Sequence, residues 1–233
     1  MNASLIDVFF FGIYPYLASA IFFLGCLIRY DREQYTWKAG SSQIMHNKNF
    51  RIASILFHVG ILAIFAGHFA GLVIPYELWT MLGISLPTKQ LIALGAGGVF
   101  GVVCFIGMTM LVYRRIFNAR VRATTTVMDT AILLVIYAQL IIGMVTIVVS
   151  TGHMDGEVMH GLMNWSRYTL TFRPTLAVEF INDVHWIYKM HVFLGMTLFV
   201  LFPFSRLVHI WSVPVGYLGR NYQVVRRRVS ATK

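Results

Sequence analysis

The chain has 233 residues, of which 58% are hydrophobic and only 12% are charged, and its mean hydropathy is +0.69. Soluble domains are about 45–50% apolar and about 25% charged, so this composition excludes an ordinary soluble domain, a disordered chain and a disulfide-rich scaffold. A net charge of +10 would indicate nucleic-acid binding in a soluble protein. Here the charges lie between apolar blocks, so they are interpreted as membrane-topology signals and no nucleic-acid partner is expected.

Five stretches of the sequence reach the roughly 20 mainly apolar residues that a membrane-crossing helix needs. They lie near residues 8–28, 52–74, 91–113, 127–149 and 186–212. The first contains Pro15, which predicts a kink, and the segment before it lacks the positive charge of a cleaved signal peptide. Residues 1–233 are therefore predicted to form a single all-α integral membrane domain with five transmembrane helices.

The distribution of Lys and Arg predicts the orientation of these helices. Cytoplasmic loops are enriched in both residues, and fifteen of the nineteen lie in segment 29–51, in the loop after the third span, or at the C-terminal end with its basic tail over 215–233. The other four are Lys89, Arg167, Arg173 and Lys189. The N-terminus is thus predicted outside and the C-terminus in the cytoplasm. A short amphipathic helix around Glu157–Arg167 is expected in the long outer loop over 150–185.

Four of the eight histidines lie within predicted spans, two in the second span and two in the fifth: His58, His68, His191 and His209. Ionisable side chains at membrane depth are costly and usually functional. A single intramembrane histidine could equally form a hydrogen bond between helices. Four of them on only two helices favour a binding role.

Helix geometry predicts how the histidines are arranged. In an ideal helix the ten-residue step from His58 to His68 turns about −80° and rises about 15 Å. The step from His191 to His209 is five full turns and about 27 Å, with Pro203 expected to kink the helix. Since the second and fifth spans run antiparallel, His58 and His209 share the cytoplasmic half, while His68 and His191 share the outer half, with about 20 Å between the two pairs.

Two imidazole pairs without a carboxylate or thiolate are suited to haem iron, whose two axial positions can be filled from facing helices. Zinc would need three or four protein ligands, and a proton relay would be expected to use Asp or Glu as well. The sequence therefore predicts a bundle around two bis-histidine b haems. The alternative from another class is a haem-free membrane anchor or transporter.

Glycines and arginines near the histidines are candidates for further haem contacts. Gly60 and Gly67 would let the flat macrocycle approach the second span closely, although close helix packing is the alternative. Haem propionates need cationic or hydrogen-bonding partners. Arg114, Arg115 and Arg206 are placed to serve the inner haem, although positive-inside anchoring also explains them.

The sequence resembles the gamma subunit of membrane-bound respiratory nitrate reductase, a di-haem cytochrome b. The resemblance runs from about residue 8 to 226 and is carried by FFFGIYPY (9–16), RYDREQYTWKAGSSQ (29–43), LFHVGILAIFAGHFAG (56–71), RVRATTT (120–126), GHMDG (152–156) and HVFLGMTLFVLFPFSRLVHIWSVPV (191–215). It implies that His58 and His209 bind the inner haem and that His68 and His191 bind the outer one, as the topology also predicts.

The resemblance further implies a subunit in a bacterial inner membrane that oxidises quinol near the outer haem. Electrons would pass inward to an iron–sulfur beta subunit attached to a molybdenum-containing alpha subunit, which reduces nitrate in the cytoplasm. The basic segments 29–51 and 215–233 would form the docking surface. The alternative is an equivalent di-haem subunit of a nitrite oxidoreductase, of another membrane-bound molybdoenzyme or of a sulfur-metabolising complex.

Lys89 is the candidate catalytic residue. It is the one basic residue of the short outer loop over 75–90, at the level of His68 and His191, so positive-inside anchoring does not explain it. The resemblance also places a lysine here, beside the quinol pocket. Such a lysine would bind a quinol oxygen or stabilise the charge that develops as protons leave. The alternative is that its ammonium group extends to the lipid headgroups.

Overall fold

The computed structural model of the chain describes residues 4–37, 48–152, 154–212 and 219. Within these ranges five helical stretches are long and apolar enough to cross a membrane, which confirms the predicted all-α fold. They are Leu5–Arg32, Lys48–Val73, Leu86–Phe117, Val127–Ser150 and Trp186–Phe204. Apart from residue 219, the predicted basic tail over 215–233 lies outside the described residues.

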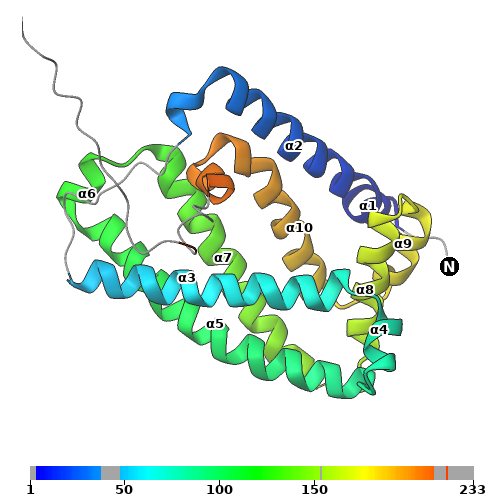
Figure 1. The fold of residues 1–233 in the computed structure, drawn as a ribbon. Helices are drawn as coiled ribbons and strands as arrows, with labels where there is room; N and C mark the ends of the chain where they lie inside the picture. The colour runs from blue at the N-terminus through cyan, green and yellow to red at the C-terminus, as the bar shows by residue number, and fades with distance from the viewer. Residues whose placement is uncertain (1–3, 38–47, 153, 213–218, 220–233) are drawn as a thin grey trace, which may run out of the picture.

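The long helices form a bundle in which each one packs against the next. α3 (Lys48–His68) packs on α5 (Leu86–Phe117), α5 on α7 (Val127–Ser150), α7 on α10 (Trp186–Leu201), and α10 on α2 (Tyr14–Arg32). In Figure 1, α3 and α5 form one side of this bundle and α2 the opposite side. Large apolar side chains such as Leu62 (66% exposed) and Val148 (69%) face outwards, as lipid contact requires.

Pro15 shapes the first span. α1 (Leu5–Asp7) is followed by the π-helical segment η1 (Val8–Ile13), and α2 begins directly after it. Proline has no N–H to donate to the carbonyl of Phe11, one turn earlier. The indole Nε1 of Trp165 donates to that carbonyl instead, at 3.0 Å, and both side chains are buried. The irregularity predicted at Pro15 is thus the π-helical turn that precedes it. Trp165 connects this turn to the segment between the fourth and fifth spans.

Short helices gather at the two ends of the bundle. The α8 end carries α4 (Tyr76–Met81), α8 (Glu157–Leu170) and α9 (Pro174–Asn182). The α6 end carries α6 (Ala119–Ala123) together with the 3-10 segments η2 (Gln34–Thr36) and η6 (Arg206–Ser212). α8 is the helix that the sequence predicts around Glu157–Arg167, whereas α9 was not predicted.

Capping residues set where two of the long helices begin. The Oγ of Ser85 accepts from the N–H of Thr88, and Pro87 lies in the first turn of α5. Thr126 and Asp129 form a reciprocal capping box at the start of α7. α5 therefore starts at Leu86, earlier than predicted, so Lys89 lies in its first turn and not in a loop.

The fifth span is not one continuous helix, which corrects the expectation of a kinked helix over 186–212. α10 ends at Leu201, a 3-10 turn covers Phe202–Phe204, and Ser205 is extended before η6 begins. Pro203 causes the break, because its ring clashes with the carbonyl of Phe199 and it has no N–H to donate. The ideal-helix spacing of His191 and His209 therefore does not apply.

Candidate functional site

The structure brings His68 and His191 together at the α8 end. His68 is the last residue of α3 and His191 lies within α10, and their ring centroids are 6.0 Å apart with planes inclined by 37°. Two imidazoles that bind one metal ion, each at about 2 Å from a ring nitrogen, have centroids roughly 6 Å apart. The separation of the two rings therefore fits a shared iron.

His58 and His209 are the histidines of the α6 end. His58 lies in α3 and His209 in η6, and none of the ring contacts of the described residues joins the two. The Nδ1 of each ring lies close to a backbone carbonyl oxygen of its own segment, Ser54 for His58 (2.7 Å) and Arg206 for His209 (2.6 Å).

His68 has the same arrangement, with its Nδ1 2.8 Å from the carbonyl oxygen of Ile64. Since a carbonyl oxygen only accepts, Nδ1 is the donor in all three rings, and Nε2 is the nitrogen that these bonds leave unused. An imidazole held by an N–H to carbonyl bond is the usual state of a metal-binding histidine. The three side chains therefore fit the role of Nε2 ligands.

Lys89 is buried at the α8 end and does not reach the surface, since only 4% of the residue is exposed. Its Nζ donates to the carbonyl oxygen of Gly71 at 3.0 Å and lies 2.8 Å from the sulfur of Met163. The same ammonium is 5.1 Å from the ring centroid of Trp79. Gly71 belongs to the π-helical segment η4 (Phe69–Val73), which directly follows His68. These contacts disagree with the alternative in which Lys89 extends to the headgroups.

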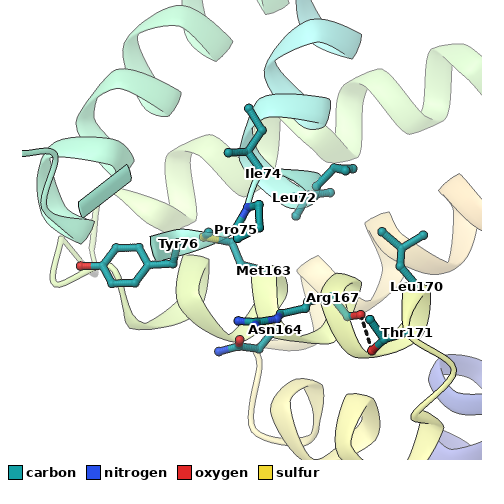
Figure 2. Close-up of a pocket in the computed structure, with 10 residues that line it drawn as sticks. Leu72, Ile74, Pro75, Tyr76, Met163, Asn164, Arg167, Leu170 and Thr171 are labelled. Carbon is teal, nitrogen blue, oxygen red and sulfur yellow. Dashed lines mark hydrogen bonds between the residues drawn. The ribbon is translucent and has the colours of Figure 1, made fainter. Parts of the chain in front are cut away.

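A cavity of about 240 Å³ lies beside Lys89, between the chain around Pro75 and α8 (Figure 2). Its lining is mostly apolar and comprises Leu72, Val73, Ile74, Pro75, Tyr76, Met163, Asn164, Arg167, Leu170 and Thr171. Met163 both lines the cavity and contacts the Lys89 ammonium. Lys89 itself is not part of the lining, so Met163 separates it from this space.

An ion pair marks the polar side of the cavity. The guanidinium of Arg167 donates to Glu77 Oε1 at 2.7 Å, and both side chains are largely exposed. Backbone hydrogen bonding and then Arg167 lower the pKa of the Glu77 carboxyl, and Glu77 raises the pKa of Arg167. Both groups stay charged over the physiological pH range. The edge of the cavity at Arg167 and Glu77, called the rim below, is therefore hydrated, while the rest of the lining is mostly apolar.

The two candidate glycines have different surroundings. A Cβ at Gly60 would lie 2.5 Å from the Cβ of Cys104, whereas a Cβ at Gly67 would meet no atom within 4 Å. The lack of a side chain at Gly60 is needed for α3 to pack on α5, which supports the packing alternative. Gly67 leaves open space next to His68, as a haem contact would require.

A family model described as the nitrate reductase gamma subunit matches residues 7–228 of the chain. The chain belongs to the nitrate reductase gamma subunit family. It is 50% identical over 226 residues to the respiratory nitrate reductase 1 gamma chain of Escherichia coli (strain K12), over 96% of this chain and 98% of the relative. It is 44% identical to the respiratory nitrate reductase 2 gamma chain of the same organism, with the same coverage. The nitrate reductase gamma chain of Bacillus subtilis (strain 168) is 34% identical, over 93% and 96%.

Membership of the gamma subunit family confirms the resemblance found in the sequence and makes the chain a membrane subunit of an oxidoreductase complex. The sequence stretches that carried the resemblance include His58, His68, His191 and His209.

The three candidate propionate partners of this gamma-subunit family member lie at the α6 end and are already in contact with other groups. Arg206 Nε donates to Asp129 Oδ1 at 2.8 Å, and Arg115 donates to Thr125 Oγ1 at 3.1 Å. The Arg114 guanidinium lies 4.2 Å from the ring centroid of Phe50. Arg206 also contacts a candidate ligand through its backbone, because its carbonyl oxygen lies 2.6 Å from Nδ1 of His209.

Arg29 has a structural role that the sequence analysis did not predict. Its Nη1 donates to the carbonyl oxygens of Pro203 (2.6 Å) and Ser205 (2.8 Å), and its Nη2 to that of Thr36 (3.0 Å). The break at Pro203 frees carbonyl groups that need donors in a membrane. Pro203 inside a span is therefore the signal from which a donor on a neighbouring helix could have been sought.

Proposed function

We propose that the chain is the di-haem b subunit of a respiratory nitrate reductase and oxidises membrane quinol at its α8 end. The meeting of His68 and His191, with their ring centroids 6.0 Å apart, carries this proposal. His68 and His191 would hold one haem, and His58 and His209 the other. When bound, the two b haems would supply one-electron carriers at two depths of the membrane.

The α8 end provides the groups that quinol oxidation requires. The Lys89 ammonium would hold a quinol oxygen and stabilise the negative charge that develops as the hydroxyl protons leave. Its present partners are the carbonyl of Gly71 and the sulfur of Met163, so a quinol oxygen would replace one of them. The apolar cavity next to Met163 would admit the ring from the lipid side, and the wet rim at Arg167 and Glu77 would let protons leave.

The proposed orientation places the α6 end in the cytoplasm. The basic residues of the α6 end follow the positive-inside rule, and protons would then be released outside while electrons move inward. Moving one charge against 100 mV costs about 2.3 kcal/mol, so the quinol must be a stronger reductant than the final acceptor by more than this amount.

Reporter fusions test the orientation. Fusions after Lys48, after Arg120 and at the C-terminus are expected to report a cytoplasmic location, and fusions near Pro87 and Gly156 an external one. A cytoplasmic signal at Gly156 would contradict the proposal, because α7 would then not cross the membrane.

The proposed partners bind at the cytoplasmic α6 end: an iron–sulfur beta subunit, and through it a molybdenum-containing alpha subunit that reduces nitrate. The basic segments 29–51 and 215–233 would form the docking surface. Purification of the intact complex in detergent, followed by mass spectrometry, identifies these partners. Co-purification with a nitrite-oxidising or sulfur-metabolising enzyme would instead establish the alternative complex.

An absorption spectrum of the purified complex tests the cofactor proposal. Two b haems are expected to give sharp bands after reduction, in an amount of two haems for each copy of this chain. A spectrum without such bands would mean that the chain is a haem-free anchor or transporter.

A further inference from the structure

His191 differs from the other three histidines in how its ring is held. Its Nδ1 is buried and has no hydrogen-bond partner among the described residues, whereas the other three Nδ1 atoms each lie near a carbonyl of their own segment. The ring of His191 instead contacts Gln139 of α7, whose amide nitrogen lies 3.4 Å from Nε2. The same amide donates to the backbone carbonyl of His191 at 3.0 Å.

Two glycines make this contact between α7 and α10 possible. Gly143 lies one turn after Gln139, and a Cβ there would come within 2.8 Å of Cε1 of His191. Gly195 lies one turn after His191, and a Cβ there would be 3.3 Å from the amide nitrogen of Gln139. His191 of α10 thus lies against Gly143 of α7, and Gln139 of α7 lies against Gly195 of α10. The two side chains therefore fix one another's position.

We propose that Gln139 is a positioning residue that orients the imidazole of His191 toward His68, through its contact with the ring and its hydrogen bond to the His191 carbonyl. The inference rests on the proposed role of His191 as a haem ligand. A ligating imidazole usually donates its second N–H to an acceptor that fixes the ring. In the structure the amide nitrogen of Gln139 contacts this ring and donates to the His191 backbone, so Gln139 is the polar group that lies against the imidazole.

The proposal is tested with Gln139→Leu in the assembled complex, since leucine has a similar volume and no polar atoms. The low-spin ferric EPR signal of the α8-end haem is expected to shift, because this signal depends on how the axial imidazoles are oriented. The α8-end haem is also expected to be lost about tenfold more readily, in line with other losses of a ligand's outer partner. The α6-end haem stays unchanged and reports that the bundle has folded. An unaltered EPR signal and unaltered retention of the α8-end haem would overturn the proposal.

Two further variants distinguish the effect of hydrogen bonding on the His191 ring from the effect of side-chain packing. Tyr137→Phe removes a hydroxyl from the same helix, where it bonds Thr109 Oγ1 at 2.9 Å, and should leave both haems unchanged. Gly143→Ala pushes directly on the ring and should move the α8-end signal. If Gly143→Ala moves that signal and Gln139→Leu does not, packing alone orients His191 and the proposal fails.

The variant His191→Ala distinguishes failure of this inference from failure of the proposed function. If His191→Ala keeps both haems, the ligand assignment is wrong and the role of Gln139 falls with it. If His191→Ala loses the α8-end haem while Gln139→Leu leaves it intact, only the positioning role is overturned.

Discussion

At the α8 end both candidate ligands lie on continuous helical backbone, whereas at the α6 end one of them follows a break in the chain. His68 closes α3 and His191 lies inside α10. His209 lies in η6, beyond the extended residue Ser205. The two histidine pairs look equivalent in the sequence, but one lies on helices without a break and the other includes a residue that follows a break in the fifth span.

The difference shows two ways in which a bundle can position a ligand. At the α8 end the neighbouring helix α7 acts on the side chain itself, through Gln139 and the space at Gly143. At the α6 end the neighbouring helix α2 acts on the backbone, because Arg29 holds the carbonyls on both sides of the break. Val208 adds to this by packing against Phe22 and Cys26 of α2.

The largest expected effect comes from removing the histidines one at a time. His58→Ala and His209→Ala should each remove the α6-end haem, and His68→Ala and His191→Ala the α8-end haem, because an axial position is lost. Reduced-minus-oxidised spectra and EPR of the four variants measure this. The matched control is His185→Ala, whose ring caps α10 by accepting from the N–H of Ile187 and should not affect either haem. Loss of the same haem in His58→Ala and His191→Ala would disprove the pairing.

Lys89→Ala should act only at the α8 end, and it should lower quinol oxidation without loss of haem. Quinol oxidation is expected to fall by about 10²-fold, as for the loss of one donor that stabilises developing charge, while both haems are retained. Nitrate reduction with an artificial donor that reduces the catalytic subunit directly provides the reference activity. Lys189→Ala is the control, because this lysine is paired with Asp7 at 3.0 Å. Normal quinol turnover in Lys89→Ala would end the proposed role.

Arg29→Ala should act at the opposite end. About tenfold weaker retention of the α6-end haem is expected, because η6 loses the donors that hold it in place, while the α8-end haem is unaffected. Arg29→Lys should restore little, since an ammonium lacks the planar fork that reaches several carbonyls at once. Haem content and redox titration measure the effect, with Arg32→Ala, one turn closer to the helix end, as the control. Equal loss in Arg29→Ala and Arg32→Ala would show that charge matters and the contacts do not.

The smallest expected effects separate the two glycines of α3. Gly60→Ala should destabilise the protein by about 1–3 kcal/mol, because the new methyl group overpacks the contact with Cys104. Gly67→Ala meets no protein atom, so it should leave the melting temperature unchanged and weaken only the retention of the α8-end haem. Thermal unfolding and haem content of both variants test this. A drop in melting temperature for Gly67→Ala and none for Gly60→Ala would reverse the assignment.

Much of the fold could be predicted from the sequence because hydropathy and charge act locally. The five apolar stretches are visible without any tertiary information, and counting membrane crossings is enough to place His68 and His191 at one depth. Pro203 also signals a disturbance in the fifth span. Whether a proline kinks or breaks a helix depends on the donors available to the freed carbonyls, and here that donor is Arg29, more than 170 residues away in the chain.

The sequence by itself determined the number of candidate spans and the grouping of basic residues at one end, because the membrane imposes length and charge rules on each segment separately. It also predicted the pairing of histidines by depth. The tertiary structure decided which groups face one another. It buried Lys89 against Gly71 and Met163, paired Arg206 with Asp129, used Gly60 for helix packing and set Gln139 against His191. Those outcomes depend on the rotation and separation of neighbouring helices, which follow from the packing of side chains that are distant in the sequence.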